Sequence, residues 1–204
     1  MGAPVIDITI VRGKTFEFSF RYAQAYLAYL DIEAMVSTAP VRLTITNHKI
    51  PDGWPVWIDG VKAPQDLNND PDGKTPYYEA SVIDADTIEL NSVNAYSWKP
   101  FIPSGQVIFY RPIDLTGYAA RMWIKDRVGG NILLKLDSDV STAPAGVIAV
   151  DATLSAFIPK LSAAATAALT WRQGVYDFEA ITPTGEVYAI AAVSRVTVAD
   201  EVTE

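Results

Sequence analysis

The sequence predicts an all-β protein in which one β domain is interrupted by a second, with a single short helix. Short runs of alternating apolar and polar residues recur along the 204 residues, a pattern typical of strands with one buried face. Thirteen prolines and 12 glycines separate these runs, as the turns of a sandwich or barrel require. About ninety residues divide the opening strands from the block that continues them, which is the length of a domain rather than a loop.

The N-terminal segment contains two alternating runs. Val5–Ile10 ends at the turn Arg12-Gly13, and Thr15–Tyr22 follows. In the second run three phenylalanines, at positions 16, 18 and 20, share one face. We expect the two runs to form a hairpin of half-buried strands, with a further strand from about Tyr29.

A block of different texture begins after Ser37-Thr38-Ala39-Pro40. It contains a polar loop from Ala63 to Pro76 and several short strand candidates. These candidates are residues 41–46, 56–58, 77–83, 87–90 and 107–110. Short strands joined by Pro- and Gly-containing turns predict a small barrel.

The remainder of the chain is again rich in strands. The candidates are residues 119–125, 132–136, 146–150, 156–159, 174–180 and 187–198, the last two joined around Thr182-Pro183-Thr184-Gly185-Glu186. Only Leu161–Leu169 favours a helix, because it is rich in alanine and Ser162 can cap it. About nine residues cannot form a stable helix alone, so this helix must pack against the sheet.

Composition excludes several classes of function. The absence of cysteine excludes disulfides, thiolate catalysis and cysteine-based zinc sites. A net charge of −8 with scattered basic residues argues against nucleic-acid binding. No apolar run is long enough for a membrane helix, and Met1 is followed almost directly by a strand, so we expect neither membrane insertion nor a signal peptide.

The outer segments resemble a family of small phage virion domains that includes the N-terminal domain of upper baseplate proteins. The matching features are the Arg12-Gly13 turn, the turn Ile113-Asp114-Leu115-Thr116-Gly117 before Arg121–Ile124, the short helix before Trp171, and the strands Val175–Glu179 and Val196–Val198. In such domains the Asp-Leu-Thr-Gly turn follows soon after the opening strand. The resemblance therefore implies that the middle block is an insertion.

The middle block is similar to a second module found in phage structural proteins, a small β-barrel that supports contacts rather than catalysis. Its matching features are Leu43–His48, Pro51–Val56, Trp57–Val61, Tyr77–Val82 and Asp84–Leu90. The family often has glycine after the histidine, whereas this chain has Lys49.

These observations define the predicted organisation. Residues 1–25 and 111–204 are expected to form a split, immunoglobulin-like β-sandwich with one short helix. Residues 26–110 are expected to form the inserted small β-barrel.

The candidate catalytic groups each have a simpler explanation. His48 is the only histidine, no Gly-x-Ser-x-Gly motif is present, and a turn histidine bound to local backbone is the favoured interpretation. Asp84 and Asp86 lie in a predicted turn, with Glu89 nearby, so solvated turn carboxylates explain them better than an acid–base pair. We predict no catalytic residue and no enzyme.

One acidic segment has the spacing of a calcium loop. Asn68, Asp70, Asp72, Gly73 and Glu79 stand where ligands and a sharp turn would be needed. However, the first ligand is Asn, Pro71 stiffens the middle, and helical flanks are missing. An exposed turn is the preferred interpretation, and we predict no metal and no cofactor.

Aromatic residues gather in the middle block. Trp54, Trp57 and Trp98, with Tyr77, Tyr78 and Tyr96, either fill a small core and its interface or form a platform for sugar. Core and interface are favoured, since aromatic side chains supply large buried areas there. Trp54, Trp57 and Trp98 are therefore candidate interface residues.

The function predicted from these features is a non-enzymatic structural component of a tailed-phage virion. Its expected place is the tail, neck or baseplate, where it attaches neighbouring tail proteins or fibres in a symmetric, multi-copy assembly after synthesis in the host cytoplasm. The expected contact sites are the edge strands Val5–Ile10 and Val187–Val198, probed at Ile8 and Val196. The alternatives are a capsid decoration or head-completion protein, and a carbohydrate-binding module at the tail tip.

Overall fold

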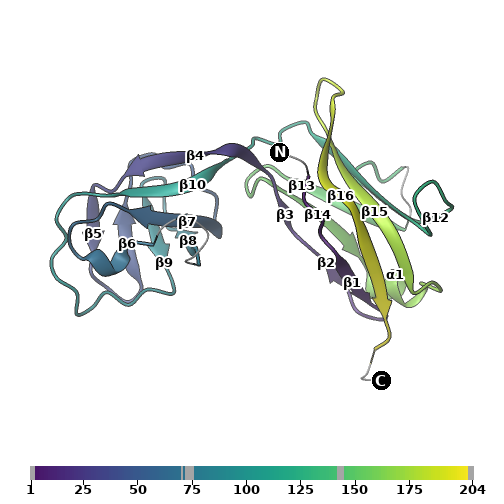
Figure 1. The fold of residues 1–204 in the computed structure, drawn as a ribbon, viewed down its shortest axis with the longest axis horizontal. Coiled ribbons are helices and arrows are strands. Elements are labelled where there is room, and N and C mark those ends of the chain that lie inside the picture. Colours follow the sequence, from purple (N-terminus) through teal and green to yellow (C-terminus); the bar gives the residue numbers. More distant parts are fainter. Residues whose placement is uncertain (1–2, 70, 72–75, 142–144, 202–204) are drawn as a thin grey trace. The chain divides into compact units, whose positions relative to one another are not determined.

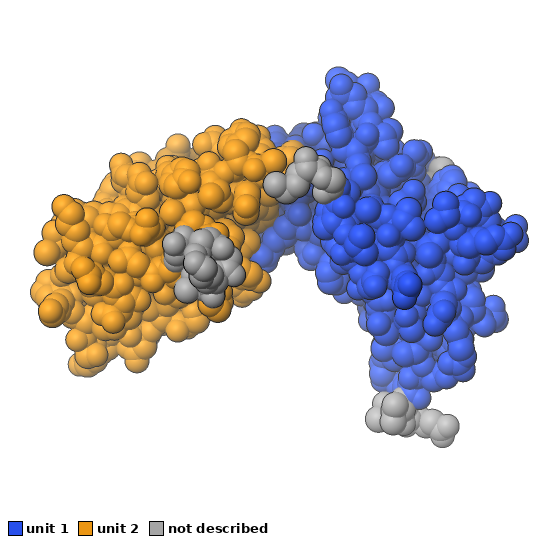
Figure 2. All heavy atoms as spheres, viewed as in Figure 1, with its two compact units in different colours: residues 1–22, 114–204 blue, residues 23–113 orange. Residues whose placement is uncertain are grey.

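The computed structural model describes residues 3–69, 71, 76–141 and 145–201 and divides the chain into two compact units (Figure 2). Unit 1 comprises residues 1–22 and 114–204, and unit 2 comprises residues 23–113. Each boundary lies three residues outside the range predicted for the inserted domain. The reason is that the first and last strands of unit 2 pair with each other from Ala23 to Pro112, so these flanking residues belong to its sheet.

The described residues of unit 1 form ten elements, whose arrangement is drawn in Figure 1. They are β1 (Ile8–Val11), β2 (Phe16–Glu17), β3 (Phe20–Arg21), β11 (Ala119–Lys125), β12 (Ile132–Asp137), β13 (Gly146–Asp151), β14 (Ala156–Leu161), α1 (Ala163–Ala167), β15 (Gln173–Ile181) and β16 (Val187–Ala199). The strands lie in the order β1-β16-β15-β11-β12-β13-β14-β2, with β3 also paired to β14. In the described part of the chain, two residue pairs connect β12 to β13. Aromatic side chains of β3 and β14 pack against β15, so the sheet folds over into the two layers of a sandwich.

The core of this sandwich is held by aromatic side chains from both layers. Phe20 of β3 and Phe157 of β14 meet Phe178 of β15 edge-to-face, with ring centroids 4.6 Å and 6.0 Å apart. All three side chains are buried. Edge-to-face packing of this kind adds to the gain from burial.

The two N-terminal strands do not form the predicted hairpin. β1 pairs in parallel with β16 at one end of the sheet, whereas β2 and β3 pair with β14 at the other. Gly13, with φ +74°, turns the chain between the two layers. The second predicted strand is interrupted opposite Pro159, which accepts a hydrogen bond from the Phe18 amide but has no N–H to return one.

The turn at Asp114–Gly117 is built by its own side chains. The Asp114 carboxylate accepts hydrogen bonds from the Thr116 hydroxyl (2.7 Å) and amide (2.9 Å), and these bonds hold its pKa below the ordinary value. Gly117 supplies the positive φ of +76°. Leu115 is buried in unit 1, so the motif combines a turn with a core anchor.

The predicted helix is present but shorter than expected, spanning Ala163–Ala167. Ser162 caps it by accepting a hydrogen bond from the Ala165 amide, as predicted. The buried Thr166 hydroxyl donates to the Lys14 carbonyl at 2.7 Å. This bond ties the helix to the turn that precedes β2, which explains how so short a helix is held.

Side chains of β15 and β16 anchor the chain's N-terminal segment. The buried Tyr176 hydroxyl donates to the Ile6 carbonyl, and the Ile6 amide donates to Ser194 Oγ at 2.9 Å. Asp7 accepts a hydrogen bond from the Arg195 amide at 2.8 Å. Residues 6 and 7, which precede β1, therefore extend the contact between this segment and β16 toward the N-terminus.

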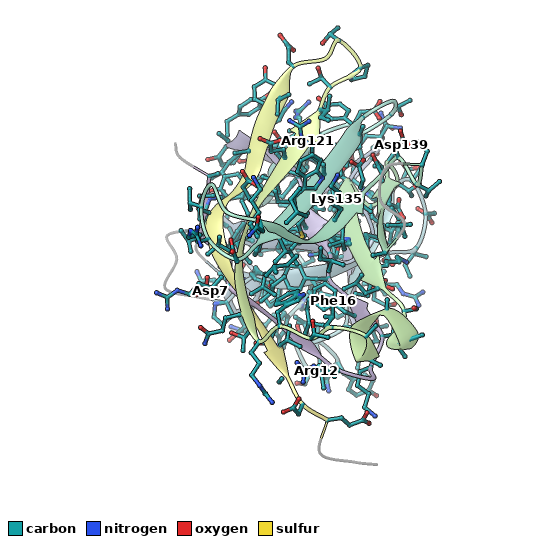
Figure 3. All side chains as sticks on the ribbon, turned by 90° about the vertical axis from the view of Figure 1, so that its right-hand side faces the viewer. Asp7, Arg12, Phe16, Arg121, Lys135 and Asp139 are labelled. Carbon is teal, nitrogen blue, oxygen red and sulfur yellow. The ribbon has the colours of Figure 1, made fainter. Side chains whose placement is uncertain are left out.

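An ion-pair cluster closes the end of the same sheet. Arg12 lies beside the end of β16 (Figure 3) and pairs with Asp200 at 2.6 Å, and Arg172 pairs with the second oxygen of that carboxylate at 2.8 Å. Arg172 and Arg12 hold the pKa of Asp200 below its ordinary value.

Where the structure describes unit 2, it contains seven strands and one short 3₁₀ helix. They are β4 (Ala23–Asp31), β5 (Ala34–Val36), β6 (Val41–Thr44), β7 (Trp54–Asp59), η1 (Gln65–Leu67), β8 (Tyr78–Val82), β9 (Thr87–Leu90) and β10 (Gln106–Pro112). The order is β4-β10-β7-β8-β9-β6-β5 (Figure 1), so the consecutive strands β4 and β5 lie at opposite ends of the sheet. Between them the Ile32 amide donates to the Gly105 carbonyl and the Glu33 amide to the Thr44 carbonyl, each at 3.0 Å. The first bond extends the β4–β10 ladder and the second extends the β5–β6 ladder, so the connection Ile32-Glu33 brings the two ends of the sheet together and closes a barrel.

The predicted all-β class is thus confirmed, with one short α-helix among the described residues and sheets that curl into sandwich and barrel arrangements. The barrel has its own hydrophobic core, contributed by residues from Ala28 to Phe109. No helix in the described part of the chain has the length and apolar character needed to cross a membrane.

Because the core of unit 2 is made from its own residues alone, unit 1 should fold without unit 2. We predict that replacing residues 23–113 with a short Gly-Ser linker leaves a protein with a cooperative thermal transition. Ala23 and Pro112 are register partners, about 5 Å apart in an antiparallel pair, so a few residues can bridge the gap. Calorimetry of the shortened and full chains tests this, and a shortened chain that melts without cooperativity would contradict it.

The Tyr176 bond predicts a measurable loss of stability. Tyr176→Phe should lower the free energy of unfolding by about 1–2 kcal/mol at neutral pH, because the Ile6 carbonyl loses its buried donor. Urea denaturation measures the change. Tyr188→Phe is the control, since Tyr188 is 49% exposed, and an equal loss in both variants would contradict the role of Tyr176.

The same residue predicts a dependence on alkaline pH. Burial raises the pKa of Tyr176 from 10.0 to about 12. Since the folded-state pKa is the higher one, its contribution is complete below pH 10.0 and is lost as the pH rises toward about 12. The stability difference between the wild type and Tyr176→Phe should therefore shrink across that interval.

Candidate functional site

His48 serves the turn in which it lies. It is 4% exposed, its Nδ1 accepts a hydrogen bond from the Ile50 amide, and its Nε2 lies 2.9 Å from the Asp84 carbonyl, to which it donates. Both ring nitrogens are engaged with backbone, as expected for a turn histidine. Asn47 and Lys49 on either side have φ of 53° and 55°, so Lys49 occupies the left-handed conformation for which glycine is favoured.

The three nearby carboxylates are also engaged in structure. Asp84 accepts a hydrogen bond from the Asp86 amide at 2.9 Å, and this bond is the main reason that the pKa of Asp84 is lowered. Asp86 accepts from the Asn47 amide at 2.7 Å. Glu89 pairs with Arg42 at 2.7 Å. These contacts secure a turn and two adjacent strands.

The calcium-loop candidate is only partly described. Asp70, Asp72 and Gly73 lie outside the described residues. Asn68 Oδ1 accepts a hydrogen bond from the Val61 amide at 2.9 Å, and Asn69 Oδ1 accepts from the Ile58 amide at 2.7 Å. The described residues contain no group of three acidic or histidine side chains placed to hold a metal ion.

Three of the predicted interface residues are core residues. Ile8 and Val196 are 7% and 0% exposed in unit 1, and Trp54 is 1% exposed in unit 2. β16 is also not an edge strand, because β15 and β1 flank it. This corrects the assignment of these side chains as contact sites: alternation places them on the faces that the two cores bury.

The other aromatic candidates separate into different environments. Trp98 lies in the loop between β9 and β10 and packs partly buried against the barrel core, whereas Tyr96 in the same loop is 83% exposed. Tyr78 also packs against the core, and its hydroxyl donates to the Leu67 carbonyl. Trp57 and Tyr77 come together, with ring centroids 6.2 Å apart.

Trp57 and Tyr77 are part of a larger aromatic surface on the outer face of the barrel. We define the aromatic strip as Tyr29 of β4, Ile108 and Tyr110 of β10, Trp57 of β7 and Tyr77 beside β8. Ile108 is the register partner of both Tyr29 and Trp57. Tyr110 lies edge-to-face on Trp57 at 6.2 Å. The strip therefore crosses adjacent strands that Figure 1 shows side by side.

All five residues of the strip lie outside the barrel core cluster, although each has at least one sequence neighbour that belongs to it or packs against it. The three tyrosines, at positions 29, 77 and 110, are 54%, 50% and 42% exposed. Ile108 is 4% exposed, because its neighbours in the strip flank it. The strip is thus an aromatic surface on which three tyrosines are exposed, Trp57 is half-buried and Ile108 is covered.

A cleft of about 580 Å³ adjoins the strip. Tyr29 and Ile108 form part of its wall, and three carboxylates line it, at Asp31, Glu33 and Asp59. Gly60 and Gly105 line it as well, and any side chain at Gly105 would meet Val61 at 2.5 Å. The close approach of these two turns thus shapes the cleft.

Sequence reasoning missed Tyr29 and Tyr110 as members of this surface. The sequence does contain a signal for them. Side chains alternate between the two faces of a strand, and each of these tyrosines is next to a core residue, so it belongs to the opposite, outer face. Their meeting with Trp57 depends on the pairing of β4 with β10 and of β10 with β7. The paired residues are far apart in the sequence, Ile108 opposite both Tyr29 and Trp57, and alternation does not reveal such pairing.

No protein-family model matches this chain, and no match to it was found among curated proteins.

The hydrogen bonds of the Asn69 side chain offer a test of its structural role. Its amide also donates to the Pro76 carbonyl at 2.9 Å, and the residue is 7% exposed. Asn69→Ala should lower the free energy of unfolding by about 2–3 kcal/mol, because the buried Ile58 amide loses its acceptor. Asn91→Ala, at an exposed asparagine, is the control. Chemical denaturation compares them, and equal stabilities would contradict this role.

Proposed function

We propose that this chain is a non-enzymatic structural component of a tailed-phage virion, in which unit 2 provides a contact surface for a neighbouring protein. The observation that carries the proposal is the aromatic strip. Contiguous exposed apolar surface is characteristic of interaction sites. Tyrosine and tryptophan are also the residues that most often anchor protein interfaces.

The polar groups of the described residues support a structural role. His48 is buried with both nitrogens bound to backbone, so it is not free to transfer protons. The carboxylates beside it hold a turn through backbone amides. Side chains of the types that perform acid–base chemistry are here engaged in keeping loops in place.

The virion assignment rests on the resemblance of the outer segments. The Asp114–Gly117 turn, the helix capped by Ser162 and the hairpin of β15 with β16 follow one another in unit 1 as they do in those phage domains. Insertion of a barrel supplies a second surface without disturbing this scaffold. In a symmetric assembly, many copies make even a weak contact of that kind effective.

Labelling of intact particles tests the proposal. Antibodies raised against the purified chain, carried on gold, should mark the tail, neck or baseplate of purified particles made from the genome that encodes it. Particles that lack the chain, obtained by deleting its gene, are the control. Label on the head surface would favour a decoration protein instead, and purified particles without any label would overturn the virion role.

A further inference from the structure

We infer that the cleft beside the aromatic strip receives an arginine or lysine side chain from an apolar segment of the partner protein. This inference rests on the proposed contact function and specifies the chemistry of the partner. It follows from the charges in the cleft, from its supply of hydrogen-bond acceptors, and from the aromatic wall.

Among the residues that the structure describes, no ion pair involves the carboxylates of the cleft. Glu33 accepts hydrogen bonds from the Thr46 amide and hydroxyl, and Asp31 accepts one from Gln106. Asp59 has no ion pair or hydrogen bond from its side chain within the described part of the chain, and no lysine or arginine is among the described residues that line the cleft. A cation entering the cleft would therefore meet uncompensated negative charge.

Two of the side chains that line the cleft already donate hydrogen bonds within the chain. The Gln106 amide already donates to Asp31 at 2.8 Å, and the Ser104 hydroxyl already donates to the Ile102 carbonyl at 2.7 Å. A sugar hydroxyl both donates and accepts, so it would need donors from the protein. A guanidinium group has five donors and no acceptor, and an ammonium group has three donors, which matches this arrangement better.

The apolar wall of the cleft can contact the stem of the partner's cationic side chain and the apolar residues next to it. Tyr29 presents an exposed ring beside the carboxylates, and a guanidinium can stack on a tyrosine face while its stem covers apolar surface. Ile108, Trp57 and Tyr110 continue the apolar surface along the strip. An apolar residue next to the cationic one would lie against them.

The occupant is a different protein rather than a second copy of this chain. Each copy carries a net charge of −8, so electrostatics favour a cationic partner over a second acidic copy. The cleft volume of about 580 Å³ is within the usual range for a binding site and suits a side chain with its neighbouring backbone.

A pair of matched probes tests the inference on the full chain. One is acetyl-Leu-Arg-amide, and the other replaces arginine with citrulline, which has the same shape without the charge. Titration followed by amide NMR should shift the signals of residues 29–33 and 104–108. The arginine probe should bind about fivefold more tightly than the citrulline probe at low salt, as expected for exposed charge pairs. This preference should fall as salt is added.

Variants assign the binding to the cleft. Asp59→Asn should remove most of the preference for arginine, whereas Asp66→Asn, an exposed carboxylate on the same unit that does not line the cleft, should leave it unchanged. Tyr29→Ala should weaken both probes, and Tyr96→Ala is its control. Equal affinities for the two probes, no shifts at tens of millimolar, or shifts of the same amides by maltotriose but not by the arginine probe would overturn the inference.

These outcomes are independent of the particle labelling. Labelled particles together with failed probe binding would leave the virion proposal intact and reject this cleft as a cationic site. If the arginine probe binds but the chain is absent from purified particles, the cationic site is supported and the virion proposal is rejected.

Discussion

The antiparallel pairing of β4 with β10 is the constraint on which the rest of unit 2 depends. It runs from Ala23 opposite Pro112 to Asp31 opposite Gln106, so the strands that begin and end the insertion lie side by side. An insertion with adjacent ends can occupy a loop of its host without separating the strands of that host. The same pairing places Tyr29 opposite Ile108 and Asp31 opposite Gln106, and thereby makes the face that carries the aromatic strip and the cleft.

In both units the two edge strands of the sheet are connected directly along the chain. In each sheet, two strands consecutive in sequence lie at opposite ends of the strand order: β1 and β2 in unit 1, β4 and β5 in unit 2. The short connection between them draws the two ends of the curled sheet together. Curling reduces the open edge available for uncontrolled pairing, and so leaves the faces of the barrel, rather than its edges, as the natural place for a specific contact.

Many polar side chains of this chain bond to backbone amides or carbonyls that have no backbone partner of their own in a strand or helix. Asn69 completes the pairing of β7, Asp114 builds a turn, Thr166 fixes the helix, and Tyr176 holds the N-terminal segment. Irregular connections need such substitutes because a buried amide or carbonyl without a partner is costly. Asp59, by contrast, is exposed with its carboxylate unpaired in the described part of the chain, which is the property expected of a group that meets a partner.

The sequence by itself determined the class of the fold and the position of most strands. Alternation has a period of two wherever one face is buried, so runs such as Ala119–Lys125 and Thr87–Leu90 identify themselves locally. The helix cap at Ser162 and the turn at Asp114–Gly117 are also local, since each depends on side chains within a few residues of the backbone that they bind.

Only the tertiary structure decided which strands are neighbours. Strands can pair whether they are near or far apart in the sequence. Here β1 pairs with β16 rather than with β2, so β16, which was predicted to be an edge strand, lies inside its sheet. Those pairings in turn decide which of the alternating faces meets a core. Ile8, Val196 and Trp54 are buried for that reason, while Tyr29, Trp57 and Tyr110 meet on the outside of the barrel although the chain between them is long.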